Sequence, residues 1–285
     1  MPTPRRTTVV TDSTAALPQD LRERWGIDVV PLHVHAGDAT YLEGVDLDAA
    51  ATARLVGSVA HVTTSQPTPA MFAAAYGRAA AAGATEIVSV HLSGELSGTV
   101  HAAALASQRG PVPVHVVDSR TVAGALGAAA VGAARAAAAG ASGADAAAAA
   151  TATSRTARAV FLVDSLDHLR RGGRLGRAAS TVGTMLGMRP LLTVRDGRID
   201  VLAKVRTRAA ATARLVQEAE QHARGLREPS VTVHHLDTPD DAAALADALG
   251  AGLGVPVAVT PVGAVLAAHV GPGLLAVVVA DEQAR

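Results

Sequence analysis

Short runs of β-branched residues alternate with alanine-rich stretches along the first half of the chain, and this alternation restricts the fold more than any other feature. The runs that predict strands cover residues 7–11, 29–34, 86–91 and 114–117. They are continuously apolar, as expected for strands that helices cover on both faces. Strands alternating with helices in this way form parallel sheets. The sequence therefore predicts an α/β domain built on a parallel sheet.

The alanine-rich stretches predict the helices that cover this sheet. Periodicity and end signals place them at residues 18–25, 48–57, 69–82, 98–107, 122–139 and 144–154. The segment 36–46 contains Gly37 and Gly44 and is expected to form a hairpin or an irregular excursion.

The pattern changes after residue 158. A short run at 160–163 precedes a short helix at 164–171, and two runs at 190–195 and 199–205 flank Asp196-Gly197, a strong hairpin signal. A helix at 207–224, a strand at 231–235 and a helix at 240–253 follow; two last runs, 255–260 and 274–280, flank a Gly/Pro-rich loop. We therefore expect an N-terminal α/β/α domain over residues 1–158 and a smaller C-terminal α+β domain over 159–285.

Composition favours an aliphatic interior. Of the 285 residues 49% are hydrophobic but only 2% are aromatic, so a binding cavity would suit an alkyl chain better than a flat ring. The formal net charge is zero, which gives no general attraction to nucleic acid. Cysteine is absent, and the first ten residues lack the apolar stretch of a signal peptide. We expect a cytoplasmic protein.

Several common activities lack their motifs. Lys204, the only lysine, lies between Ala203 and Val205, so no Walker A loop is present. No HExxH, EF-hand or GxSxG pattern occurs, and the GxGxxA match at 271–276 stands before a strand rather than opening a helix. The histidines, including the adjacent pair His234 and His235, lack carboxylates at ligand spacing. We predict no metal site and no cofactor.

Small polar residues follow three predicted strands, at Asp12-Ser13-Thr14, Ser93-Gly94 and Asp118-Ser119. In open parallel sheets, ligands bind beyond the carboxyl ends of the strands, where helix N-termini present free amides. Such residues are also ordinary helix caps. They indicate where a site would lie without identifying its ligand.

Six segments in a fixed order together resemble the DegV family, and they span almost the whole chain. They are Val10-Thr-Asp-Ser-Thr14, Thr64-Ser-Gln-Pro67, Leu92-Ser-Gly-Glu-Leu-Ser-Gly-Thr99, Asp164-Ser-Leu-Asp-His-Leu-Arg-Arg-Gly-Gly-Arg174, Lys204-Val-Arg-Thr207 and Ala268-His-Val-Gly-Pro-Gly273. The resemblance implies a two-domain fold that holds a long-chain fatty acid between its domains, and a carrier rather than an enzyme.

The resemblance to the family's FakB-type carriers also assigns residues. It implies that the ligand carboxylate is bound by Thr64, Ser97, Gly98 and His269, with Arg206, Ser65 and Thr99 near the headgroup. From the residues alone, Thr64 and Ser97 are equally explained as helix caps, and His269 as a structural loop histidine. Where many relatives carry Ser-Ser, this chain has Ser93-Gly94, followed by Glu95, a carboxylate that must point away from an anion site.

The resemblance further implies partners. A separate fatty acid kinase would phosphorylate the bound acid, and enzymes of phospholipid synthesis would use the acyl phosphate. Arg170, Arg171 and Arg174 are expected to form an exposed partner surface, in contact with these enzymes or transiently with lipid headgroups. An inert solvated face explains the same arginines.

Two other functions stay open at this point. Ser97 and His269 could form the dyad of a lipid ester hydrolase, with Asp12 or Asp118 orienting the imidazole. The protein could instead bind another amphiphilic small molecule. The family's N-terminal domain resembles that of dihydroxyacetone kinase, but this chain has no recognisable nucleotide loop.

Overall fold

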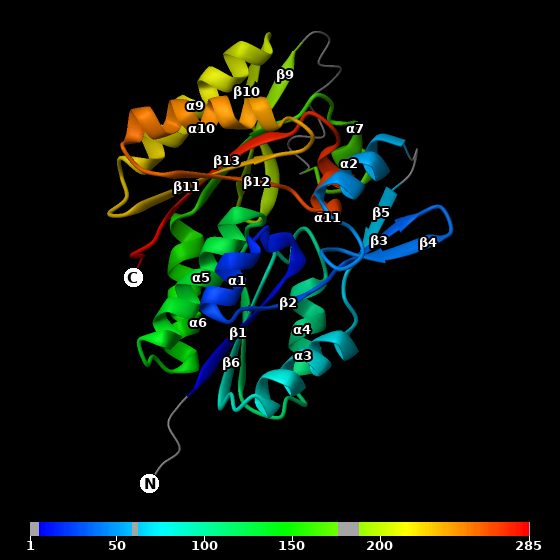
Figure 1. The fold of residues 1–285 in the computed structure, drawn as a ribbon, viewed down its shortest axis with the longest axis vertical. Helices are drawn as coiled ribbons and strands as arrows, with labels where there is room; N and C mark the ends of the chain where they lie inside the picture. The colour runs from blue at the N-terminus through cyan, green and yellow to red at the C-terminus, as the bar shows by residue number, and fades with distance from the viewer. Residues whose placement is uncertain (1–5, 59–61, 176–187, 285) are drawn as a thin grey trace.

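The computed structural model describes residues 6–58, 62–175 and 188–284, which form three sheets with helices packed against them (Figure 1). The first sheet is parallel, in the order β2-β1-β6-β7. Its strands are β1 (Thr7–Asp12), β2 (Asp28–Val30), β6 (Glu86–His91) and β7 (Val114–Asp118). The prediction of an α/β fold built on a parallel sheet is confirmed.

Helices cover both faces of the first sheet, as its continuously apolar strands required. Val9 and Val88 belong to a core shared with α5 (Gly124–Ala138) and α6 (Gly143–Thr156). Their chain neighbours Val10 and Ile87 pack on the other face, against α3 (Pro69–Ala81) and α4 (Thr99–Ser107). Because successive residues of a strand point to opposite faces, each strand contributes to two cores.

After β2 the chain builds a small antiparallel sheet in the order β4-β3-β5. Its strands are β3 (His33–Ala36), β4 (Ala39–Leu42) and β5 (Val62–Ser65), and α2 (Ala49–Ser58) lies between β4 and β5 along the chain. The hairpin expected in 36–46 is present and turns at Gly37, whose φ is +58°. The single strand expected over 29–34 is wrong, because Pro31, which lacks an N–H, separates β2 from β3.

The third sheet has six strands, in the order β10-β9-β8-β13-β11-β12. They are β8 (Arg158–Leu162), β9 (Arg189–Arg195), β10 (Arg198–Val205), β11 (Pro229–His235), β12 (Val257–Pro261) and β13 (Leu275–Asp281). Asp196 and Gly197 join β9 to β10 with φ of 50° and 81°, values that suit the predicted two-residue hairpin. One face packs against α9 (Arg208–Ala223) and α10 (Pro239–Leu253).

The opposite face of the six-stranded sheet packs against two short helices, α7 (Asp167–Arg171) and α11 (Ala264–Val270). Two further short helices, η1 (Ser13–Ala15) and α1 (Gln19–Trp25), follow β1. The expectation that a Gly/Pro-rich loop fills the chain between β12 and β13 is wrong, because α11 lies there. Seven residues between glycines are too few to show a helical period.

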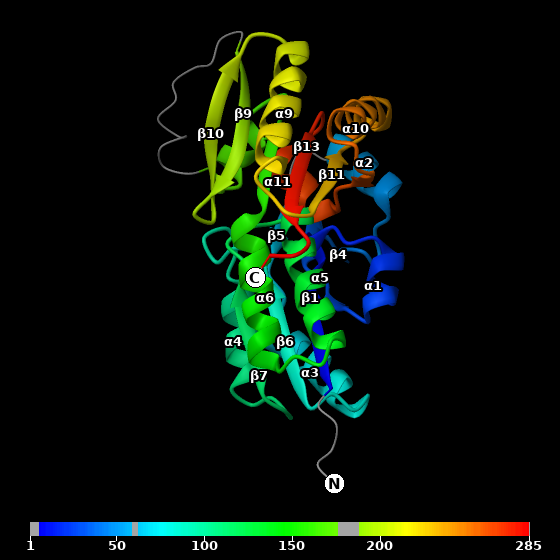
Figure 2. The ribbon, with the colours of Figure 1, turned by 90° about the vertical axis from the view of Figure 1, so that its left-hand side faces the viewer.

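The two halves of the chain interlock at α11. Figure 2 shows the six-stranded sheet above the parallel sheet, and β5 contacts α11. Leu32 and Val34, from the first half, share a buried cluster with Ala264 and Val265 of α11. A second junction joins Ala125 of α5 to the six-stranded sheet. The boundary at 158/159 stays a prediction: it falls after the first residue of β8, and the small sheet of the first half packs against α11.

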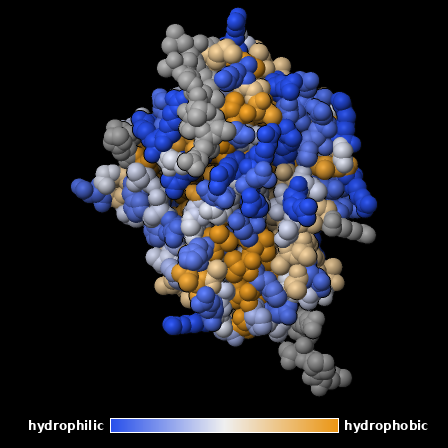
Figure 3. All heavy atoms as spheres, turned by 180° about the vertical axis from the view of Figure 1, so that it is seen from behind, coloured by the Kyte–Doolittle hydropathy of each residue, from blue (hydrophilic) through white to orange (hydrophobic). Residues whose placement is uncertain are grey.

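The face seen in Figure 3 is mostly hydrophilic in its upper half, with a hydrophobic strip in its lower half. Such a mixture is usual for a folded chain in water, since apolar atoms contribute more than half of most protein surfaces. No helix in the described ranges has the length and apolar character needed to cross a bilayer.

Glu43 fixes the small sheet to α11 with a buried carboxylate. The backbone N–H of Val265 donates to Glu43 Oε1 at 2.8 Å, and the side chain is 5% exposed. Burial, together with the charge of Asp12, raises the pKa of Glu43 to about 7. Because the raised pKa means that the folded protein favours the protonated carboxyl group, Glu43 contributes to stability below the ordinary carboxyl pKa. This contribution is lost as the pH rises through 7.

We therefore expect the free energy of unfolding to fall between pH 5 and pH 8, partly through ionisation of Glu43. Glu43→Gln should remove that part, which is at most about 3 kcal/mol, while its amide oxygen still accepts from Val265. Urea unfolding of both proteins across this pH range measures the difference. An equal fall in the two proteins would show that Glu43 does not titrate there.

Candidate functional site

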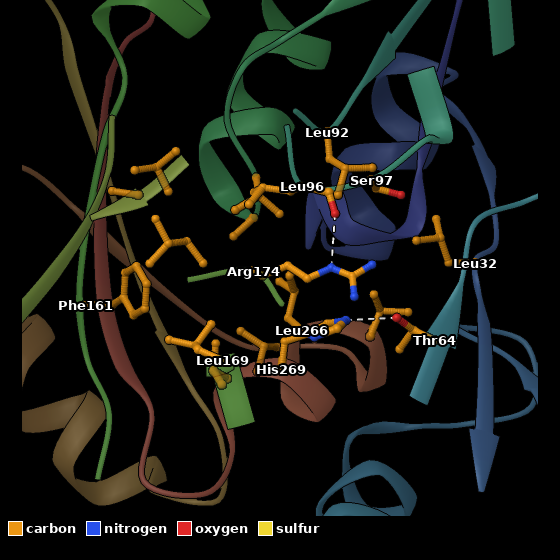
Figure 4. A pocket seen from close by; sticks show the side chains of 18 of the residues that line it. Leu32, Thr64, Leu92, Leu96, Ser97, Phe161, Leu169, Arg174, Leu266 and His269 are labelled. Atoms are coloured by element: carbon orange, nitrogen blue, oxygen red, sulfur yellow. Dashed lines mark hydrogen bonds between the residues drawn. The ribbon is translucent and has the colours of Figure 1, made fainter. Parts of the chain in front are cut away.

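A cavity of about 380 Å³ lies between the parallel sheet and the six-stranded sheet (Figure 4). Ligand cavities in proteins usually hold roughly 300–1,000 Å³. Its walls are mainly aliphatic and come from both halves of the chain, among them Leu32, Leu92, Leu96, Leu266, Leu274 and Ile199. Among its described lining residues, Arg174 is the only one of the types Asp, Glu, Lys and Arg. We call this space the central cavity.

The polar end of the central cavity is formed by Thr64 and His269. Thr64 lies on β5 and His269 in the last turn of α11, and Thr64 Oγ1 lies 2.9 Å from His269 Nε2. Figure 4 shows this bond on the side of the cavity opposite Phe161. Two residues that the sequence placed in one site, 205 positions apart, are thus in direct contact.

His269 is neutral in this setting. Burial, followed by the charges of Arg174 and His168, lowers the pKa of His269 to about 4. Its buried Nδ1 has no hydrogen-bond partner among the described residues. A neutral imidazole has one donor and one acceptor nitrogen. When Nε2 carries the proton it donates to Thr64 Oγ1, and the hydroxyl hydrogen of Thr64 is then free for a ligand.

Ser97 and Gly98 line the cavity just before α4. Ser97 Oγ lies 2.8 Å from Thr99 Oγ1 and accepts from the Thr99 N–H at 3.3 Å. Thr99 is itself fully buried, so these bonds position Ser97. Gly98 has an ordinary φ of −73°. Its lack of a side chain makes room for Gln66, because a Cβ on Gly98 would overlap Gln66 Oε1.

Gln66 was not among the predicted site residues, although it lines the cavity next to Ser65. The only signal for it is its place inside the segment Thr64-Ser-Gln-Pro67. Ser65 lines the cavity as well, and its Oγ lies 2.9 Å from His35 Nε2.

Arg174 and Arg206 lie differently with respect to the central cavity from what the sequence predicted. Arg174 lines the central cavity, and its Nε donates to the Leu96 carbonyl at 3.2 Å. Gly173, with φ of 68°, turns the chain after α7 so that Arg174 points inward. Arg206 is exposed beyond the end of β10, an edge strand, and does not line the cavity.

A second space, which we call the outer hollow, lies on the other side of the Thr64–His269 pair. It measures about 400 Å³, and its lining includes His168, Arg171 and Arg174. Arg170 is exposed on the same helix α7, 3.9 Å from Asp167. Thr64, His269 and Arg174 line both spaces.

Glu95 lies at the same loop but does not oppose an anion in the cavity. Its carboxylate pairs with the Arg198 guanidinium at 2.6 Å, on the hairpin of the six-stranded sheet. The pair is about half exposed.

The geometry does not favour the hydrolase. Within the described chain, hydrogen bonds join His269 to Thr64 and Ser97 to Thr99, and none joins Ser97 to His269. Asp12 binds His91 at 3.0 Å, and Asp118 accepts from the backbone of Gly94 and Arg120. Neither carboxylate orients His269.

A connected Ser–His–Asp chain does exist elsewhere. Asp12 Oδ2 binds His91 Nδ1, and His91 Nε2 lies 2.6 Å from Ser89 Oγ. All three side chains are fully buried and lie on β1 and β6 of the parallel sheet. No substrate can reach a serine sealed in this way, so the chain of bonds holds the core together.

Comparison with known proteins gives consistent matches along the whole chain. A family model described as "Uncharacterised protein, DegV family" matches residues 6–282. A DegV domain-containing protein of Streptomyces coelicolor is 47% identical over 280 residues, which cover 97% of this chain and 99% of that protein.

Solved structures agree. A DegV family protein from Thermus thermophilus, described as binding fatty acid, has 36% identity and a TM-score of 0.89. DegV from Bacillus subtilis, described as a fatty acid binding protein, has 32% identity and a TM-score of 0.90. Each match covers 97% of this chain and 99% of the other.

The contact between Gly98 and Gln66 can be tested by a double-mutant cycle. Gly98→Ala should lower the free energy of unfolding by about 1 kcal/mol, because the new methyl group displaces the Gln66 amide. In a Gln66→Ala background most of that cost should disappear, a coupling of about 0.5–1 kcal/mol. Urea unfolding of the four proteins gives the value, and an equal cost in both backgrounds would contradict the contact.

Proposed function

The chain belongs to the DegV family, and we propose that it binds a long-chain fatty acid, with the carboxylate at Thr64 and His269 and the tail in the central cavity. The observation that carries this proposal is an aliphatic cavity that ends in a hydroxyl–imidazole pair. The Thermus thermophilus and Bacillus subtilis relatives, described as fatty acid binders, support it.

The polar end suits a carboxylate. An ionised carboxyl group only accepts hydrogen bonds, so it needs donors that converge on two oxygens. The Thr64 hydroxyl, positioned by neutral His269, is one donor, and the Ser97 hydroxyl lines the same cavity. Arg174 supplies the positive charge that balances the ligand. In this proposal Arg174 takes the headgroup role first assigned to Arg206.

The tail supplies most of the binding energy. Burying about 14 methylenes at roughly 0.8 kcal/mol each gives a gross gain of about 11 kcal/mol. Association costs roughly 4–15 kcal/mol, and each charge-assisted hydrogen bond adds about 1.5–3 kcal/mol. The headgroup contacts therefore set orientation and select a carboxylate over other heads.

The chain acts as a carrier in the cytoplasm and leaves the chemistry to partners. A separate fatty acid kinase phosphorylates the bound acid, and enzymes of phospholipid synthesis use the acyl phosphate. The outer hollow supports this step, since it adjoins Thr64 and His269 and carries Arg171 and Arg174. Arg170 and Arg171 on α7 form the surface for these enzymes and for transient membrane contact.

Titration with a fluorescent or isotope-labelled long-chain fatty acid tests the proposed grip. Thr64→Ala or His269→Ala should raise the dissociation constant about ten- to hundredfold, as expected for the loss of a hydrogen bond to a charged group. Thr63→Ala is the matched control, because Thr63 is the exposed neighbour on β5 and does not line the central cavity.

Circular dichroism should show all three variants folded. Unchanged affinity in both Thr64→Ala and His269→Ala would refute the assigned contacts. Preference for a neutral amphiphile over a fatty acid in the wild type would favour the other-amphiphile alternative.

A further inference from the structure

One wall of the central cavity is a face of the six-stranded sheet. Strand register places His234 of β11 opposite Ala276 of β13, and Ala276 opposite Phe161 of β8. All three line the cavity, whereas Val233, the neighbour of His234, faces the core under α9 and α10. Two large side chains therefore flank a small one, which leaves a trough over the sheet.

Alanines mark the course of this trough. Ala159, two residues before Phe161 on β8, lies opposite Val278, and Ala123, just before α5, lines the same cavity. The larger residues Val194 and Ile199 line the cavity from β9 and β10, which lie on the side of β8 away from β13. Space for an extended alkyl chain thus runs from Phe161 over the alanines toward His234.

A further space, which we call the side groove, begins directly behind His234. It measures about 570 Å³ and lies between α1, the start of α5 and strands β11 to β13. Among the described residues, only His234 and Val278 line both the central cavity and the side groove. The partition between the two spaces is one side chain thick.

His234 is held rigidly in this partition. Its Nε2 accepts from the Gly124 N–H at 3.1 Å, and its Nδ1 lies 3.2 Å from the Thr260 carbonyl oxygen, to which it donates. Burial lowers its pKa to about 4, so the ring is neutral. A Cβ on Gly124 would lie 2.5 Å from Nε2, which shows how closely the ring fits. With both nitrogens occupied by backbone groups, the ring offers no free polar atom to the cavity.

We propose that His234, together with Val278, is the end stop that limits the length of the bound acyl chain. This inference rests on the proposed function and names a specificity determinant for it. An alkyl chain anchored at Thr64 and His269 runs along the alanine trough and meets the imidazole. Beyond that ring it would enter the side groove.

A chain-length series tests the end stop. Saturated fatty acids of about 12 to about 22 carbons are titrated into each protein. Each added methylene that is buried should strengthen binding about fourfold until the cavity is full. The wild type should show such a rise up to a limit and no gain beyond it. His234→Ala should move the limit to longer chains by several methylenes, since the chain gains the side groove.

Three further variants control the result. His234→Gln keeps an acceptor for Gly124 and fills the partition, so it should keep the wild-type limit. Ile199→Ala enlarges the opposite part of the cavity and should move the limit by less than His234→Ala does. Val278→Ala opens the partition without removing a hydrogen bond, and it carries the test if His234→Ala does not fold.

The outcomes separate the two levels of the proposal. If the wild type binds fatty acids and both His234→Ala and Val278→Ala keep its chain-length limit, the end stop is overturned and fatty acid binding stands. A larger shift of the limit in Ile199→Ala than in His234→Ala has the same consequence. A wild type that binds no fatty acid of any length overturns both.

Discussion

The hydrogen bond between Thr64 and His269 is the interaction on which the site depends, because each partner comes from a different half of the chain. Neither residue is placed by its local sequence. Thr64 is held by the pairing of β5 with β3, and His269 by the packing of α11 between the small sheet and the six-stranded sheet. Glu43 secures this arrangement by accepting from the N-terminal turn of α11. The bond therefore reports whether the two halves are correctly assembled.

The site combines a mainly apolar cavity with little fixed charge. Burial keeps two cavity-lining histidines, His269 and His234, neutral. Neutral His269 can donate a hydrogen bond to Thr64. His234 forms part of the cavity wall, and both of its ring nitrogens are hydrogen-bonded to backbone groups. Arg174 then provides a positive charge where an anionic head would lie. An amphiphile with one acidic head and one long apolar tail matches this distribution.

The sequence predicted features whose cause is local. The parallel strands follow from apolar runs such as 86–91, and the hairpin at Asp196-Gly197 from two residues that tolerate positive φ. Strand β5 and helix α11 were missed because they are short and depend on partners far along the chain.

The same distinction applies to the candidate site. Thr64, Ser97 and His269 were found through the family's motifs, not through a local signal, and the structure places all three on one cavity. The inward turn of Arg174 and the outward position of Arg206 depend on how α7 and β10 lie in the assembled fold. The fit of Gln66 against Gly98 and the burial of His234 between two spaces are tertiary facts that no spacing in the sequence encodes.

Mass spectrometry of the lipid extracted from protein purified under native conditions tests the central claim most directly. The account predicts a long-chain fatty acid in a near-stoichiometric amount, released only when the protein is denatured or exchanged against added acid. A protein that carries no acyl chain, and takes none up when fatty acid is supplied, would contradict it.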